Sequence, residues 1–151
     1  MTVLAASQAQ ETSTDSCAVF SYDAAFSRNI GWVTHEEQQK LRGKRVAIAG
    51  MGGVGGIHAV TLARLGVGAF SIADFDHVDI VNFNRQTCAN VSTLQEPKVS
   101  VMAEQVRNIN PEVDLSIFSE GVTDENIDTF LDGADLFVDG FDFFVLGIRR
   151  K

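Results

Sequence analysis

The sequence has 151 residues, a length typical of one domain. Hydrophobic residues make up 45% of it and charged residues 21%, and this balance excludes an intrinsically disordered chain. The formal net charge is -8, whereas binding to nucleic acid or to an anionic membrane depends on clustered Lys and Arg. We therefore expect neither a nucleic acid nor a membrane as a partner. The 2 cysteines cannot by themselves form a disulfide framework or a structural zinc site.

The two ends of the sequence differ from its middle. Residues 1–21 contain no Lys, no Arg and no long apolar run, so they predict a flexible tail rather than a targeting signal. Since no stretch approaches the roughly 18 apolar residues of a membrane span, we expect a soluble cytoplasmic protein. Residues 139–151 stop within an apolar segment. This predicts that residues 22–151 form an incomplete domain, the front part of a longer protein.

The first predicted elements precede a glycine-rich stretch. Residues 26–30 favour a short helix or a turn. Thr34 and Glu37 form a capping box at the start of a helix that extends to Arg42. Residues 45–50 are a short apolar run that ends in Gly, which is typical of a strand buried on both faces.

Helix and strand patterns then alternate along the chain. Gly66 is expected to end a helix, Pro97 to lie in the first turn of another, and Thr123 to cap a third. The predicted helices are residues 54–65, 97–109 and 123–131, and the predicted strands are residues 69–74, 113–117 and 135–139. Residues 113–117 alternate between apolar and polar, as in a half-exposed strand at a sheet edge. The alternation predicts an α/β fold, a Rossmann-like parallel sheet with helices on both faces, which ends after its fourth strand.

The stretch from Gly50 to Gly55 follows the first of these strands and opens a helix. Glycines there allow a tight turn and the close approach of a phosphate, and the free N–H groups of a helix start favour negative charge. Asp74 ends the next strand, where its carboxylate can accept hydrogen bonds from ribose hydroxyls. Together these features predict a nucleotide site. The alternative is that the glycines only let helix and strand pack closely.

Two cations favour ATP over a dinucleotide. Arg85 lies in the segment 82–86, and Lys98 opens the predicted helix after Pro97. A dinucleotide used for hydride transfer gains little from two extra cations, whereas a triphosphate under attack needs its charge neutralised. The alternative is that both residues are ordinary surface cations.

Five motifs, in this order along most of the chain, resemble the ThiF/MoeB/HesA family of adenylyltransferases, relatives of the ubiquitin-activating enzymes. They are Gly50-Met-Gly-Gly-Val-Gly55, Ala73-Asp-Phe-Asp76, Asn82-Phe-Asn-Arg-Gln86, Pro97-Lys98 and Asp139-Gly-Phe-Asp142. The resemblance implies an enzyme that uses Mg-ATP to convert a carboxylate into an acyl-adenylate, with release of pyrophosphate. It implies that this carboxylate is the C-terminus of a ubiquitin-like or sulfur-carrier protein, or a related acid. It also implies a homodimer.

The resemblance implies a role for each matching residue. ATP would be bound by Gly50, Gly52, Gly53, Gly55, Asp74, Asn82, Arg85, Lys98 and Asp142. Within this set Asp74 would hold the ribose, Asn82, Arg85 and Lys98 the triphosphate, and Asp142 the Mg2+ ion. Arg28 would enter the ATP site of the partner subunit, and with Arg85 and Lys98 it completes the predicted catalytic residues.

The sequence departs from the family at one position and ends before two further features. The family has Asn after the Asp placed at 142, whereas this chain has Phe143, so nucleotide contacts at this edge are expected to differ. The paired Cys-x-x-Cys zinc ligands and the cysteine used for thioester or persulfide chemistry would lie beyond Lys151.

Other chemically suggestive residues are assigned structural roles. Cys88 has no activating residue near it in sequence, and the histidines lack the spacing of metal ligands. Asp76 and Asp79 are expected to be solvated loop residues, with assistance to Mg2+ as the alternative. Trp32 is expected to be a packing anchor of the N-terminal segment. The residues to which no chemistry is assigned are Cys17, Cys88, His35, His58 and His77.

Three alternative functions remain open. A tRNA threonylcarbamoyladenosine dehydratase is similar in residues 52–55 and 101–104, although the net charge gives no support to tRNA binding by this chain. An NAD-dependent oxidoreductase would share the glycine loop. A non-catalytic nucleotide-binding subunit would share the whole site.

Overall fold

The computed structural model describes residues 19–141, and four parallel strands form the centre of the protein. The strands are β1 (Arg45–Ala49), β2 (Ala69–Ala73), β3 (Asp114–Phe118) and β4 (Leu136–Asp139). Their order in the sheet is β3-β2-β1-β4, and Ile48 of β1 lies between Ile72 and Val138 of its two neighbours. The predicted edge strand, β3, is at one edge of this sheet.

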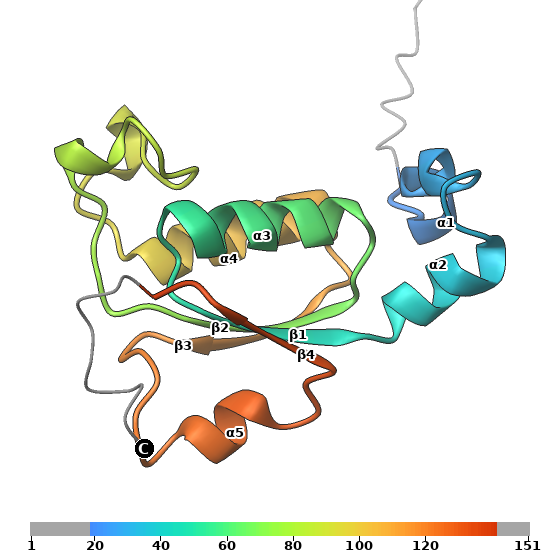
Figure 1. The fold of residues 1–151 in the computed structure, drawn as a ribbon. Helices are drawn as coiled ribbons and strands as arrows, with labels where there is room; N and C mark the ends of the chain where they lie inside the picture. The colour runs from blue at the N-terminus through green and yellow to red at the C-terminus, as the bar shows by residue number, and fades with distance from the viewer. Residues whose placement is uncertain (1–18, 142–151) are drawn as a thin grey trace, which may run out of the picture.

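Helices cover both faces of the sheet, which confirms the predicted α/β fold. In Figure 1, α3 and α4 lie side by side on one face and α5 lies on the other. The helices are α1 (Tyr22–Ala25), α2 (His35–Arg42), α3 (Gly53–Arg64), α4 (Lys98–Ile109) and α5 (Ile127–Leu131). Short 3-10 turns occur at Ser27–Asn29, Ile80–Asn82 and Val91–Thr93. No helix within residues 19–141 is long and apolar enough to cross a membrane.

The two faces of β1 carry side chains of different size. Val46 and Ile48 belong to the larger core cluster beneath α3 and α4, whereas Ala47 and Ala49 belong to a smaller cluster with Phe130 of α5. These four residues of β1 are buried, as predicted for this strand. Successive side chains of a strand point to opposite faces. The face of β1 with Val46 and Ile48 therefore packs against α3 and α4, and the face with Ala47 and Ala49 packs against α5.

The predicted helix ends agree with the structure at α2 and α3. The Thr34 side chain accepts a hydrogen bond from the Glu37 N–H group, and Glu37 reciprocates, so the capping box is confirmed. Gly66, with φ +89°, follows α3 in the left-handed conformation that glycine adopts without strain. Its N–H group donates to Ala63 and that of Val67 donates to Leu62, the two hydrogen bonds of a Schellman motif.

Two local predictions are wrong. Thr123 does not cap α5, because Asn126 accepts from the Thr123 N–H group and donates to Gly121, which holds residues 121–126 in a turn before the helix. Trp32 is 94% exposed and anchors nothing among residues 19–141. Gly31, with φ +114°, turns the chain beside it.

Tyr22 attaches the N-terminal segment to the end of α3. Its hydroxyl donates to the Gly66 carbonyl oxygen at 2.5 Å and accepts from Gln38 Nε2 at 3.0 Å. Asn29 and Gln38 both donate to the Leu65 carbonyl oxygen, at 3.2 and 2.9 Å. These bonds satisfy carbonyl groups that have no partner within the helix.

We expect Tyr22→Phe to lower the free energy of unfolding by about 1–3 kcal/mol, because it leaves buried partners of the hydroxyl unsatisfied. Urea denaturation would measure this change. Ser27→Ala is the matched control, since its hydroxyl makes one exposed hydrogen bond to Ala24, and it should change stability by less than about 0.5 kcal/mol. Equal losses for the two variants would contradict the role assigned to Tyr22.

Candidate functional site

The turn between β1 and α3 contains glycines of two kinds. A Cβ atom on Gly55 would overlap the Gly50 carbonyl oxygen, and one on Gly50 would lie 2.8 Å from the Gly140 oxygen. Both glycines therefore allow close backbone packing. In contrast, a Cβ on Gly52 or Gly53 would meet nothing closer than 3.5 Å. The fold does not require glycine at 52 and 53, and both positions line an open pocket.

The N-terminus of α3 faces this pocket. The first hydrogen bond of the helix runs from the Gly56 N–H group to the Gly52 carbonyl oxygen. Gly53 and Val54 precede it, and their N–H groups have no backbone acceptor among residues 19–141. Since a helix of 12 residues has a positive end of its macrodipole there, the pocket favours an anion beside Gly52 and Gly53.

Asp74 lies where β2 ends, and its carboxylate is tied to the glycine turn. It accepts hydrogen bonds from the Met51 N–H group at 2.5 Å and from the Asp76 N–H group at 2.7 Å. Only 7% of the residue is exposed. Burial raises the pKa of Asp74, while the two backbone hydrogen bonds and Lys98 oppose that shift. Each carboxylate oxygen retains capacity to accept another hydrogen bond, which a ribose hydroxyl could donate.

The segment after β2 carries three polar side chains into the same pocket. Asn82 is buried, and its Oδ1 atom accepts from the Asp79 N–H group at 2.9 Å. Arg85 is exposed, and its Nη1 atom donates to the Val81 carbonyl oxygen and to Asn84 Oδ1, both at 3.0 Å. The other guanidinium N–H groups have no acceptor within the described chain. Gln86, 8% exposed, places its amide beside Gly52.

Lys98 supplies a buried cation. Its residue is 5% exposed, and its Nζ atom lies 3.0 Å from Asp76 Oδ2. The Lys98 backbone N–H group also donates to the Asp76 carbonyl oxygen at 2.9 Å. Asp76 is therefore a partner of Lys98 rather than only the solvated loop residue that the sequence predicts.

These groups surround one pocket of about 430 Å³ at the carboxyl ends of the strands. Seven of the nine predicted ATP-binding residues line it. Its lining is Gly50, Gly52, Gly53, Val54, Asp74, Phe75, Asp76, Asn82, Arg85, Gln86, Lys98, Gly140 and Phe141. In an open parallel sheet this edge is where ligands bind. The structure brings together the segment 50–54 with Gly140 and Phe141, which are far apart in the sequence.

Two predicted residues lie elsewhere, and a third is not described. Gly55 is behind the turn and acts in packing, as the alternative interpretation of the glycines had it. Arg28 follows α1, which Figure 1 shows at the other end of α3. Its neighbour Asn29 donates to the Leu65 carbonyl oxygen there. Because 12 helical residues span about 18 Å, Arg28 is remote from the pocket of its own chain. Asp142 lies outside the described residues, as does Phe143.

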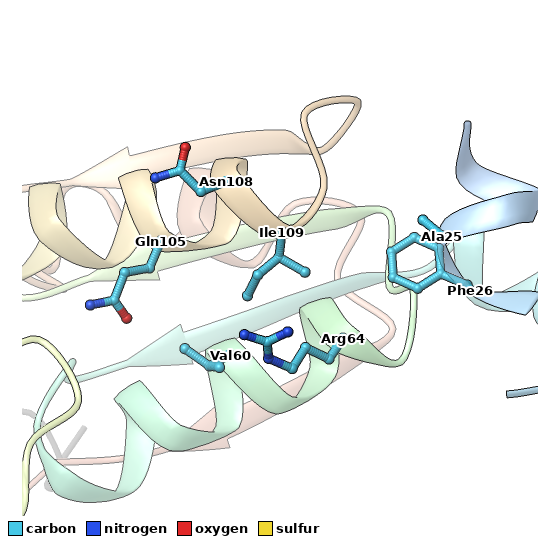
Figure 2. A pocket seen from close by; sticks show the side chains of 7 residues that line it. All are labelled: Ala25, Phe26, Val60, Arg64, Gln105, Asn108 and Ile109. Atoms are coloured by element: carbon cyan, nitrogen blue, oxygen red, sulfur yellow. The ribbon is translucent and has the colours of Figure 1, made fainter. Parts of the chain in front are cut away.

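A second hollow, of about 530 Å³, lies between α3 and α4. Figure 2 shows Val60 and Arg64 of α3 opposite Gln105 and Ile109 of α4, with Phe26 at one end. It is comparable in size to the pocket at the strand ends, but it contains none of the predicted site residues. Its charged lining residue, Arg64, is exposed.

Of the two cysteines, Cys17 lies outside the described residues. Cys88 is fully buried, and burial raises the pKa of its thiol, so a reactive thiolate is disfavoured. Within residues 19–141 no group of three His, Cys, Asp or Glu side chains is placed to hold a metal ion. Asp79 accepts from the Val81 N–H group at the start of a 3-10 turn, a local capping role.

Comparison with known proteins identifies the family. The sequence matches the model of the ThiF family over residues 26–149. The chain belongs to the ThiF family. It is 41% identical over 107 residues to the tRNA threonylcarbamoyladenosine dehydratase of Bacillus subtilis, a match that covers 71% of this chain and 42% of that protein. It is 32% identical over 98 residues to the molybdopterin-synthase adenylyltransferase of Salmonella typhimurium, covering 65% of this chain and 39% of that protein.

Solved structures agree with this membership. The Escherichia coli tRNA N6-threonylcarbamoyladenosine dehydratase, TcdA, in complex with ATP, has a TM-score of 0.76 and 31% identity to this chain. The match covers 80% of this chain and 50% of that one. The ThiF-family relatives thus include adenylyltransferases and a protein that binds ATP. This chain spans less than half the length of the curated relatives named above.

The two kinds of glycine give a paired prediction. Gly53→Ala should leave the free energy of unfolding unchanged or raise it by up to about 1 kcal/mol, since Ala is the better helix residue and has space. It should nevertheless weaken ATP binding about tenfold, because the methyl group would occupy the approach to the helix N-terminus. Gly55→Ala should lower stability by about 3 kcal/mol through overlap with Gly50. Thermal unfolding would measure stability, and calorimetric titration would measure ATP affinity. An unaltered ATP affinity in Gly53→Ala would contradict the role of Gly53 in phosphate binding.

Proposed function

We propose that this protein binds Mg-ATP and transfers its adenylyl group to a carboxylate, which forms an acyl-adenylate and releases pyrophosphate. The observation that carries this proposal is the pairing of two cations, Arg85 and Lys98, with an unobstructed helix N-terminus in one pocket. Three phosphates need several positive groups, whereas the pyrophosphate of a dinucleotide needs fewer. The similarity to an ATP-bound relative supports the same ligand.

In the proposed reaction the carboxylate oxygen attacks the α-phosphate, and the bond to the pyrophosphate oxygen breaks. Gly52 and Gly53 place backbone N–H groups beside the phosphates, and Asp74 accepts from the ribose. Arg85 and Lys98 offset the charge that develops on the phosphates during attack. Catalysis would thus come from positioning and charge neutralisation rather than from a covalent enzyme intermediate.

Magnesium is part of the proposal because ATP binds as its magnesium complex. Mg2+ commonly takes one or two protein carboxylates, phosphate oxygens and water. Asp142 remains the proposed ligand, and its position lies outside the described residues.

Two acids are candidates for adenylation. One is the C-terminal carboxylate of a ubiquitin-like or sulfur-carrier protein, which the similarity to the molybdopterin-synthase adenylyltransferase supports. The other is the carboxylate of threonylcarbamoyladenosine in tRNA, which the 41% identity to the dehydratase supports. The net charge of -8 opposes tRNA binding by this chain, so the second candidate requires cations from elsewhere in the assembly.

A homodimer would complete the site. Arg28 is exposed and lies at the end of its own chain's α3 that is remote from the pocket. It can therefore reach an ATP site only in a partner subunit. Trp32, which is close to it in sequence and 94% exposed, supplies apolar surface that such a partner would cover.

Ligand choice tests the proposal first. Calorimetric titration of the intact protein should show tighter binding of Mg-ATP than of NAD. Addition of the correct acid should then support exchange of labelled pyrophosphate into ATP. Tighter binding of NAD would favour an oxidoreductase, and ATP binding without exchange for either class of acid would favour a non-catalytic subunit.

The role of Arg85 gives a quantitative test. Arg85→Ala should lower the rate of pyrophosphate exchange about a hundredfold, and by a larger factor than it weakens ATP binding, because charge grows in the transition state. Arg85→Lys should recover part of the rate, since an ammonium cannot replace the guanidinium fork. Arg107→Ala, at the far end of α4, is the control and should exchange at the wild-type rate. A wild-type rate in Arg85→Ala would show that Arg85 is an ordinary surface cation.

The dimer predicts complementation between two inactive variants. In a mixed dimer of Arg28→Ala and Arg85→Ala subunits, one site receives both arginines. Equal mixing should restore roughly a quarter of the wild-type sites. Exchange activity after subunit mixing, with dissociation and reassociation verified by mass photometry, measures the recovery. No recovery in a mixture with verified exchange would exclude action of Arg28 in the partner's site.

A further inference from the structure

Lys98 forms an ion pair with Asp76, and both residues line the proposed ATP pocket. The Lys98 side chain is 7% exposed, whereas that of Asp76 is 55% exposed. Burial of an ammonium group is costly unless a counter-charge or hydrogen bonds compensate it. In the described chain Asp76 is the one residue with which Lys98 forms an ion pair. The buried cation therefore depends on Asp76.

Asp76 holds Lys98 at two points. The Asp76 carbonyl oxygen accepts from the Lys98 backbone N–H group at 2.9 Å, and its carboxylate contacts Nζ at 3.0 Å. The strand-like pairing continues beyond them, since the Val78 N–H group donates to Glu96 and Gln95 donates to Val78. Asp76 thus holds both the backbone and the ammonium group of Lys98.

Asp76 is itself fixed to the glycine turn. Its N–H group donates to Asp74 Oδ1, and the other oxygen of Asp74 accepts from Met51, which lies between Gly50 and Gly52. A continuous series of hydrogen bonds therefore links the ammonium of Lys98 to the turn that faces the phosphates. Asp74 and Asp76 have different roles in it, because one bonds only backbone N–H groups and the other binds the cation.

An ammonium group has three N–H donors, and Asp76 uses one of them. The remaining donors can bind a phosphate oxygen without release of Asp76. A lysine side chain carries about 2 kcal/mol of rotamer entropy, so fixing it before the ligand arrives reduces the cost of binding.

We propose that Asp76 is a positioning residue, which acts through Lys98 to hold its ammonium toward the bound triphosphate. This inference rests on the proposed ATP site. Asp76 touches no phosphate in this arrangement, and its negative charge alone would oppose ATP binding. The gain in ATP affinity from the oriented Lys98 ammonium must therefore exceed the loss from repulsion between the Asp76 carboxylate and the phosphates. Removal of the hydrogen-bond acceptor and removal of the charge should then change ATP affinity in opposite directions.

The test compares Asp76→Ala with Asp76→Asn in the intact protein, by calorimetric titration with Mg-ATP and with AMP. Asp76→Asn keeps an oxygen that accepts from Lys98 and removes the charge, so ATP should bind as well as in the wild type or more tightly. Asp76→Ala removes the acceptor and should weaken ATP binding about tenfold, the effect of one hydrogen bond to a charged group. AMP affinity should change by less than about twofold, since AMP lacks the outer phosphates.

A double-mutant cycle identifies Lys98 as the intermediary. In a Lys98→Met background, Asp76→Ala should no longer weaken ATP binding, because the group that it positions is gone. Asp135→Ala is the matched control, since Asp135 forms a Lys–Asp pair with Lys44 at 2.6 Å, away from the pocket, and should leave ATP affinity unchanged. The inference is overturned if both Asp76 variants tighten ATP binding equally, which indicates repulsion alone. It is also overturned if both weaken it only when Mg2+ is present, which indicates a metal ligand.

A second readout needs no nucleotide. Modification of Lys98 by an amine-reactive ester, followed by peptide mass spectrometry, should be slow in the wild type and in Asp76→Asn and fast in Asp76→Ala. Equal rates in all three proteins would overturn the positioning role. If the rates differ as expected but ATP does not bind, the proposed function fails while the Asp76–Lys98 arrangement stands.

Discussion

The contact between the first turn of α3 and the end of β1 determines where a ligand can bind. Gly55 has no room for a side chain because the Gly50 carbonyl oxygen occupies that space, and Gly50 in turn lies against Gly140. The helix can therefore begin immediately beside the sheet edge. Its free N–H groups then point into the pocket formed by the loops after β1, β2 and β4. A larger residue at 55 would move the helix start and separate these groups.

This close approach also depends on the small side chains on one face of the sheet. Ala47, Ala49 and Ala73 form the layer under α5, whereas Val46, Ile48 and Phe70 fill the layer under α3 and α4. The bulk of the core is thus beneath α3, which follows the glycine turn, and α4, which begins with Lys98. Since packed interiors deform little, these two helices give the pocket a rigid wall.

Much of the fold followed from the sequence because its strands are short, apolar and separated by clear helix signals. The capping box at Thr34 and the glycine at 66 are local chemistry, so both were predictable. The same holds for the shared location of Asp74, Arg85 and Lys98, since parallel strands end at one edge. The prediction for Thr123 failed because the Asn126 side chain bonds to the Thr123 N–H group and the Gly121 carbonyl oxygen, which holds these residues in a turn, and the helix begins after Asn126.

Contacts between distant segments could not be predicted from the sequence. The ion pair of Asp76 with Lys98 joins positions 22 apart, and no spacing rule indicates it. Gln86 belonged to a recognised motif, but its burial beside Gly52 is a tertiary feature. Trp32 was expected to anchor the N-terminal segment by packing, but it follows the turn at Gly31 and is exposed.

That exposed indole makes the protein a natural optical probe of its own N-terminal segment. The 151 residues contain 1 tryptophan, so within them indole fluorescence comes from a single position four residues after Arg28. In an isolated subunit the indole is in water, and its emission is that of a solvated ring. Any surface that covers this segment must exclude that water and shift the emission to shorter wavelength. Association of the N-terminal segment can therefore be followed in real time without a label, separately from events in the pocket at the opposite end of α3.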